Sequence, residues 1–207
     1  MARLTPRRAL FPLLAAALLS AGLLGGCDKG GPAASSFKAV DITGADYAQT
    51  LNLPDAEGRM RSLADFKGKV AVVFFGFTQC PDVCPSTLAE LAAVKQSLGA
   101  AGADVQGVFV SIDPTRDTPA ILKAYVGNFG ADFVALRGDD EQTKAAAKAF
   151  KVFYAKVPGK TDGSYTMDHT AGSYVFDRQG KVRLFTRYGT GAEALTHDLK
   201  ILLAEKP

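Results

Sequence analysis

The segment KVAVVFFGF at 69–77 limits the possible folds more than any other part of this chain. It is an almost continuous run of apolar, β-branched and aromatic residues, as expected for a central strand that is covered on both faces. With 47% apolar residues among 207, the chain can bury a large core, which excludes a wholly disordered or collagen-like protein. The run therefore predicts an α/β domain.

Strand and helix patterns alternate through the rest of the chain. Strands are expected at 105–112 and 131–136, an extended segment at 152–157, a hairpin at 173–177 and 181–187, and a smaller hairpin at 51–53 and 61–63. Helices are expected from about 88 as far as Gly99, and at 118–129, 139–150 and 193–205. This order predicts a thioredoxin-like fold, with a mixed central sheet, helices on both faces and an N-terminal β-hairpin extension.

The amino terminus resembles a bacterial secretion signal. Arg3, Arg7 and Arg8 precede an apolar run at 9–24, which is shorter than the roughly 20 residues that cross a membrane and is interrupted by proline and glycine. The small residues before Cys27 resemble a lipobox, in which this cysteine is acylated and becomes the first residue of the mature protein. An ordinary signal peptide with an incidental cysteine is the alternative.

The chain is therefore expected to have three parts. Residues 1–26 are expected to form a lipoprotein signal peptide, 27–36 a lipidated flexible tether, and 37–207 the folded thioredoxin-like domain on the periplasmic side of the cytoplasmic membrane. The chain has 24 basic and 21 acidic residues, and the arginines of the signal account for the net charge of +3. No net basic charge is left on the domain to favour a nucleic-acid partner.

Cys80 and Cys84 carry the strongest chemical signal. With Cys27 used for the lipid, they are the remaining thiols in a compartment that tolerates disulfides. They lie between the first buried strand and a helix, whose dipole is expected to make both thiols unusually acidic. Their i, i+4 spacing lets the two sulfurs share a metal ion or close a redox-active disulfide. A permanent disulfide is the alternative, but so short a ring adds little stability.

Two sulfurs do not complete a metal site, and the chain contains two histidines, His169 and His197. His169 lies in a predicted loop before the 173–177 strand, at the sheet edge where the cysteines emerge, so its imidazole can reach them. A surface histidine is the alternative. His197 is expected to be solvated on a charged face of the last helix. Met167 offers a thioether, although packing is its expected use.

The expected donor set, two thiolates and one imidazole, suits Cu(I), and a weak fourth ligand allows Cu(II) as well. Zinc with an open position remains an alternative, whereas iron–sulfur clusters need more cysteines. Asp82 and Asp168 flank the candidate ligands and are expected to orient His169 or to set the local charge; alternatively, Asp82 satisfies N–H groups of the first helical turn. Arg116 has no evident role within its own turn, so we expect it to support the ligands.

Three motifs together resemble the Sco/SenC family of copper-delivery proteins. They are FFGFTQCPDVCPSTL at 74–88, VSIDPTRDTP at 110–119 and YTMDHTAGSYVFDRQG at 165–180. The resemblance extends from about residue 37 to the carboxyl terminus. It implies that Cys80, Cys84 and His169 bind copper, and that the chain serves assembly of the dinuclear copper centre of cytochrome c oxidase subunit II. Some members of the family are thought to reduce the target cysteines instead or in addition.

The leading hypothesis is a membrane-anchored copper metallochaperone, not an enzyme, that exchanges one copper ion with acceptor thiolates. The alternative is a thiol–disulfide reductase, in which Cys80 attacks a substrate disulfide and Cys84 resolves the mixed disulfide. A peroxidase ranks below both, because Thr78-Gln79-Cys80 lacks the Thr-x-x-Cys spacing of peroxiredoxins.

Overall fold

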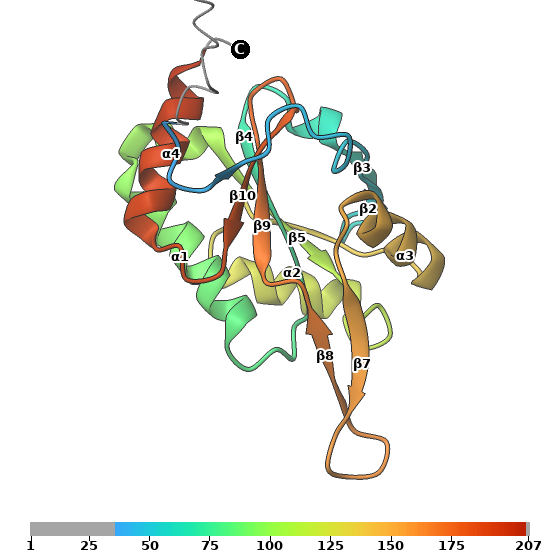
Figure 1. Ribbon diagram of the computed structural model, residues 1–207. Coiled ribbons are helices and arrows are strands. Elements are labelled where there is room, and N and C mark those ends of the chain that lie inside the picture. Colours follow the sequence, from blue (N-terminus) through green and yellow to red (C-terminus); the bar gives the residue numbers. More distant parts are fainter. Residues whose placement is uncertain (1–35, 206–207) are drawn as a thin grey trace, which may run out of the picture. The chain divides into compact units, whose positions relative to one another are not determined.

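The computed structural model of the chain describes residues 36–205 (Figure 1). The predicted signal peptide at 1–26, the expected lipidation residue Cys27 and nearly all of the predicted tether at 27–36 lie outside the described residues. Within 36–205, no helix is both long enough and apolar enough to cross a membrane. The described residues form an α/β domain around a six-stranded sheet.

The central sheet has the strand order β1-β10-β9-β4-β5-β6. Its strands are β1 (Val40–Asp41), β4 (Val70–Gly76), β5 (Val105–Ser111), β6 (Val134–Leu136), β9 (Gly172–Phe176) and β10 (Val182–Arg187). β4, β5 and β6 are parallel, while β9 is antiparallel to β4 and β10 is antiparallel to β9. The mixed sheet confirms the predicted fold class, and β4 is buried along its whole length, as its apolar sequence predicts.

Helices cover both faces of this sheet, as predicted. They are α1 (Val83–Ser97), α2 (Pro119–Gly127), α3 (Asp140–Ala149) and α4 (Ala192–Ala204), with short 3-10 helices η1 (Leu63–Phe66) and η2 (Gly99–Asp104). Phe74 and Phe109 are register partners on one face, where Phe109 packs against Tyr125 of α2. Phe75 points to the opposite face and packs on Phe150, directly after α3.

A small hairpin lies between β1 and β4 in the chain and confirms the hairpin that the sequence predicts. It consists of β2 (Asn52–Pro54) and β3 (Met60–Ser62). Its turn is organised by Asp55, a buried carboxylate that accepts hydrogen bonds from the backbone N–H groups of Glu57 and Arg59 at 3.0 and 2.9 Å. A β-bridge between Asp55 and Leu136 attaches the hairpin to β6 at the edge of the sheet.

A separate two-stranded ribbon projects from the domain in Figure 1. It consists of β7 (Tyr154–Pro158) and β8 (Tyr165–His169). The prediction that His169 lies in a loop is wrong, because this residue ends β8 and pairs with Tyr154 of β7. The residues before it alternate as in a strand, with Met167 buried between exposed Thr166 and Asp168. Met167 is therefore a packing residue, as expected.

Candidate metal centre

Cys80, Cys84 and His169 lie together although they come from three different elements. Cys80 is in the loop after β4, Cys84 is in the first turn of α1, and His169 ends β8. One possible ligand atom from each residue lies within 4.8 Å of the other two. Within the part of the chain that the structure describes, this is the only such group of three or more His, Cys, Asp or Glu side chains.

The spacing of the donors fits a single metal ion. Zinc lies about 2.3 Å from sulfur and about 2.0–2.1 Å from imidazole nitrogen, so trigonal or tetrahedral angles place these two donors about 3.6–3.8 Å apart. Sγ of Cys84 and Nε2 of His169 are 3.7 Å apart. Two sulfurs and one imidazole also form the kind of donor set that suits Cu(I) and leaves a position for a further ligand.

The backbone orients the imidazole of His169. Its Nδ1 lies 3.0 Å from the carbonyl oxygen of Thr170, so an Nδ1–H group donates there and Nε2 keeps its lone pair for the side of the thiols. The ring packs edge-on against Phe74 and Phe77, at centroid distances of 6.0 and 5.9 Å. Burial lowers the pKa of His169 below its ordinary value of 6.5, which favours the neutral form that binds metals.

The two cysteines differ in exposure. Both are free thiols, but Cys84 is fully buried whereas Cys80 is half-buried. The prediction that the helix dipole makes both thiols acidic is wrong for Cys84, because burial raises the pKa of this thiol well above its ordinary value. Cys80 lies in the loop before α1, where its Sγ accepts the backbone N–H of Cys84 at 3.4 Å.

The two acidic residues that flank the ligands do not orient the imidazole; the carbonyl of Thr170 does. Asp82 precedes α1, but its carboxylate accepts from the hydroxyl of Ser86 at 3.1 Å and from none of the first-turn N–H groups. Asp168 is exposed and lies on the opposite face of β8 from His169. Its charge acts on the imidazole through space and favours the protonated ring, against the larger effect of burial.

Arg116 has a structural role that its own turn does not reveal. Its Nε pairs with the buried carboxylate of Asp113. Its Nη1 donates to Oε1 of Gln79 at 3.0 Å and to the carbonyl oxygen of Tyr165 at 2.7 Å. Gln79 precedes Cys80 and Tyr165 begins β8, so this one guanidinium touches both segments that carry the candidate ligands.

Sequence reasoning misses Asp117, which is fully buried behind the cysteine loop. Its carboxylate accepts hydrogen bonds from the hydroxyls of Thr78 and Ser111, both at 2.6 Å, and from the backbone N–H of Thr78 at 3.2 Å. This carboxylate therefore fixes the residue two positions before Cys80. The sequence contains one signal for this contact. Thr78 follows β4 and Asp117 follows β5, and the carboxyl ends of adjacent parallel strands meet at one edge of a sheet.

His197 is not part of the group. Its side chain is 44% exposed, as expected, and its Nδ1 lies 2.9 Å from Asp198. The expectation of a charged, solvated face is wrong for Asp198, which is fully buried. The carboxylate of Asp198 accepts the backbone N–H groups of Lys38 and Ala39, both at 2.8 Å, and so holds the start of the described domain against α4.

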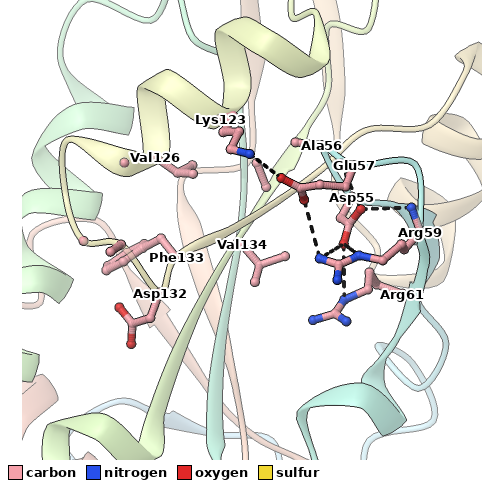
Figure 2. A pocket seen from close by; sticks show the side chains of 14 residues that line it. Asp55, Ala56, Glu57, Arg59, Arg61, Lys123, Val126, Asp132, Phe133 and Val134 are labelled. Carbon is pink, nitrogen blue, oxygen red and sulfur yellow. Dashed lines mark hydrogen bonds and ion pairs between the residues drawn. The ribbon is translucent and has the colours of Figure 1, made fainter.

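A cavity of about 510 Å³ lies between the β2–β3 hairpin, α2 and β6 (Figure 2). Several of its charged side chains pair with one another, Lys123 with Glu57 at 2.7 Å and Arg59 with Asp55 at 3.0 Å. The cavity has no lining residue in common with the cysteine–histidine group. The candidate site is therefore defined by its converging donors and not by this cavity.

Comparison with known proteins places the site in a family context. A family model described as SCO1/SenC matches residues 40–204. The SCO2-like protein of Rickettsia felis is 39% identical over 132 residues, which are 63% of this chain and 64% of that relative. The chain thus matches less than two thirds of the length of this curated relative.

Solved structures match over almost their whole length. ScoI of Bradyrhizobium japonicum with copper bound is 38% identical, with a TM-score of 0.67 over 74% of this chain and 97% of that chain. Apo Sco1 of Thermus thermophilus is 34% identical, with a TM-score of 0.70 over 82% of this chain and 99% of that chain.

Proposed function

Because this chain belongs to the SCO1/SenC family, we propose that it is a copper carrier and not an enzyme, with one copper ion as its cargo. Cys80, Cys84 and His169 hold the ion, and the receiving site is the dinuclear copper centre of cytochrome c oxidase subunit II. The observation that carries the proposal is the convergence of the three donors within 4.8 Å. The copper-bound ScoI structure of Bradyrhizobium japonicum supports copper as the cargo.

Delivery proceeds by exchange of ligands, with no electrons gained or lost by the carrier. An acceptor thiolate adds to the three-coordinate ion and then displaces the carrier ligands one at a time. Each carrier sulfur that leaves the ion takes up a proton, and each acceptor thiol that binds gives one up, so charge and protons balance. The half-buried position of Cys80 supports this route, because it leaves one side of the group accessible.

Anaerobic titration of the reduced chain with Cu(I) and with Cu(II) tests the proposal. We expect one copper ion per chain, and a strong loss of Cu(II) affinity in His169→Ala. His197→Ala is the matched control, because His197 lies outside the group, and it should bind copper like the wild type. Equal Cu(II) binding by wild type and His169→Ala would remove the histidine from the mechanism.

A thiol–disulfide reductase is the second candidate function, favoured by the hydrogen bond from the N–H of Cys84 to Sγ of Cys80. The Cys80 thiolate attacks a disulfide of the subunit II copper site and releases one substrate thiolate. Cys84, after losing its proton, attacks Sγ of Cys80 and releases the second substrate thiolate. The substrate gains two electrons and the carrier becomes a disulfide, which an external dithiol must reduce again.

Metal-free protein and an oxidised peptide with the copper-site cysteines of subunit II test this second function. A reductase converts the peptide to its dithiol in a redox buffer, and Cys80→Ser abolishes the reaction. Complete inertness of the wild type across a range of redox buffers would eliminate the reductase and leave the carrier.

A lipid on Cys27 is proposed to hold the chain on the outer face of the cytoplasmic membrane. The arginines, the apolar run and the small residues before this cysteine support the assignment. Expression of Cys27→Ser tests it, since loss of the acyl chains should move the protein from the membrane to the soluble fraction and abolish labelling by a fatty acid. Unchanged labelling of Cys27→Ser would contradict the lipid anchor.

A further inference from the structure

Tyr165, the first residue of β8, is held through both its side chain and its backbone by the turn between β5 and α2. Its hydroxyl donates to Asp113 at 2.9 Å, and its carbonyl oxygen accepts from Nη1 of Arg116 at 2.7 Å. The guanidinium also stacks on the tyrosine ring, with 3.7 Å between its central carbon and the ring centroid. Asp113 and Arg116 therefore fix the start of the strand that ends at His169.

Phe77 forms a second connection from Arg116 to the imidazole. The buried ring of Phe77 lies 5.7 Å from the guanidinium carbon of Arg116. Its centroid lies 5.9 Å from that of the His169 ring, at an interplanar angle of 89°. Movement of the guanidinium would thus change the packing beneath the imidazole as well as the position of β8.

The placement of Arg116 is not optimal for stability. Its Nη2 atom is buried and has no hydrogen-bond partner among residues 36–205. A buried donor without a partner is destabilising, and such a group in a native protein calls for an explanation. The explanation here is that Nη1 donates to two acceptors, on Gln79 and Tyr165. Because the guanidinium is rigid and planar, this orientation leaves Nη2 without an acceptor.

We propose that Arg116 is a positioning residue that keeps the imidazole of His169 over the two thiols, an inference that rests on the proposed function. The cysteines have anchors of their own, because Asp117 binds Thr78 and Cys84 belongs to α1. Loss of Arg116 therefore releases the histidine and leaves the pair of sulfurs in place.

This selective release changes which copper ion the site retains. Cu(I) is soft and is satisfied by two thiolates, whereas Cu(II) needs nitrogen or oxygen donors. Without Arg116 the imidazole is no longer held within bonding distance, so the site keeps Cu(I) and loses Cu(II). Arg116 thus determines the range of oxidation states in which the cargo is held.

The test compares Cu(I) and Cu(II) binding by the detergent-solubilised full chain and by Arg116→Met under anaerobic conditions. We expect Arg116→Met to lose about 10- to 100-fold in Cu(II) affinity and to lose the imidazole nitrogen coupling in the electron paramagnetic resonance spectrum. Its Cu(I) affinity should stay within about twofold of the wild type.

Arg137→Met is the matched control. Arg137 binds the same turn, through the carbonyl oxygen of Pro114 at 2.8 Å, but makes no hydrogen bond to β8 or to the cysteine loop within the described range. It should keep wild-type affinity for both ions. A loss of Cu(II) binding in Arg137→Met equal to that in Arg116→Met would show that any damage to the turn has this effect, and would overturn the inference.

The double variant Arg116→Met/His169→Ala separates positioning from general damage. If Arg116 acts through His169, the double variant should bind copper with the same affinity as His169→Ala, within about twofold. Additive losses would overturn the inference. Absence of copper binding by the wild type would instead contradict the proposed function.

Arg116→Lys covers the case in which Arg116→Met does not fold. Lysine keeps the charge beside Asp113 but lacks the planar fork that reaches Gln79 and Tyr165 together. It is therefore expected to fold and still to lose Cu(II) affinity. Wild-type Cu(II) affinity in Arg116→Lys would show that charge alone suffices, and would overturn the inference.

Discussion

Gly76, at the end of β4, provides the space in which the thiol of Cys84 packs. A Cβ atom at this position would lie 2.8 Å from Sγ of Cys84, 2.8 Å from the ring of Phe74 and 2.9 Å from the ring of Phe109. All three neighbours are buried, so none of them can move aside without disturbing the core. The absence of a side chain here is thus a condition for the observed position of the sulfur.

Gly76→Ala is expected to destabilise the domain by about 1–3 kcal/mol through overpacking, and to weaken copper binding by displacing Cys84. Urea unfolding and Cu(I) titration measure the two effects. Gly127→Ala is the matched control, because a Cβ there meets nothing within 4 Å at the end of α2. It should leave stability unchanged or raise it by about 0.4–1 kcal/mol. Wild-type stability of Gly76→Ala would refute this account of the packing.

The grouping of Cys80, Cys84 and His169 could be predicted from the sequence, because a strand end, a cysteine spacing and the scarcity of histidines mark them. The state of the Cys84 thiol could not, because burial depends on neighbours that the spacing does not reveal. For Arg116, the expected support of the ligands could not be specified from the sequence, because its partners on the cysteine loop and at Tyr165 are 37 and 49 residues away. Local patterns carry no information on such contacts.

At the level of elements, β8 determines the direction in which the imidazole points. Its side chains alternate, so Tyr165, Met167 and His169 face the domain, while Thr166 and Asp168 are exposed on the other face. A displacement of one residue along a strand reverses these faces. A histidine in a flexible loop would not be subject to this constraint.

The double variant Asp168→His/His169→Ala, in which the imidazole is exchanged to the neighbouring position, tests this constraint. The imidazole then points away from the thiols, and Cu(II) affinity should fall to that of His169→Ala. Met167→Leu is the control for altered packing of β8 and should bind copper like the wild type, since it preserves volume. Wild-type copper affinity of the exchanged variant would show that the segment behaves as a loop.

The turn of the β2–β3 hairpin predicts a dependence of stability on pH. Burial by itself raises the pKa of Asp55, but hydrogen bonds from Arg59 and Glu57 outweigh it and hold this pKa below its ordinary value of 3.8. Because the folded pKa is the lower one, the carboxylate stabilises the fold above about pH 4, and this contribution is lost as the pH falls through the folded pKa.

Asp55→Asn is expected to lower the free energy of unfolding by about 1–3 kcal/mol at neutral pH, because it removes a charged acceptor of three hydrogen bonds. Its stability should also fall less steeply than that of the wild type below about pH 4. Urea unfolding at a series of pH values measures both. Parallel pH profiles for the two proteins would exclude Asp55 as the titrating group.

The elements that form the core were the predictable ones. The run at 69–77 became β4, and the small hairpin and the four helices are where their patterns indicated. β8 was missed because it belongs to a ribbon outside the central sheet, with one buried residue, Met167. A strand that buries so little leaves a weak hydrophobic pattern.

At the level of the whole molecule, the candidate ligands join parts of the chain that are distant in sequence, since Cys84 and His169 are 85 positions apart. Cys80 lies in the loop between β4 and α1, Cys84 lies in α1, and His169 belongs to the projecting ribbon. A metal ion bound by all three cross-links these parts. It binds the folded state more tightly than the unfolded one, in which only the closely spaced cysteines remain together, so binding adds to stability.

Thermal unfolding with and without Cu(I) measures this coupling. At a free Cu(I) concentration of about 100 times Kd, the wild type should gain at most about 2.7 kcal/mol, which corresponds to a rise in Tm of up to roughly 5–10 °C. Cys84→Ser, which lacks one of the two sulfurs, should show a much smaller rise. An unchanged Tm of copper-loaded wild type would mean that the ion does not bridge these segments.

The unequal burial of the two sulfurs imposes an order on release. Cys84 is enclosed by the sheet, whereas Cys80 faces the surface in part. In the proposed carrier, a receiving protein can therefore reach the ion beside Cys80 but not from the side of Cys84, so we expect the bond to Cys80 to break before the bond to Cys84. The proposed hand-over thus has a preferred direction, and we expect the receiver to present its thiols away from the enclosed side of Cys84.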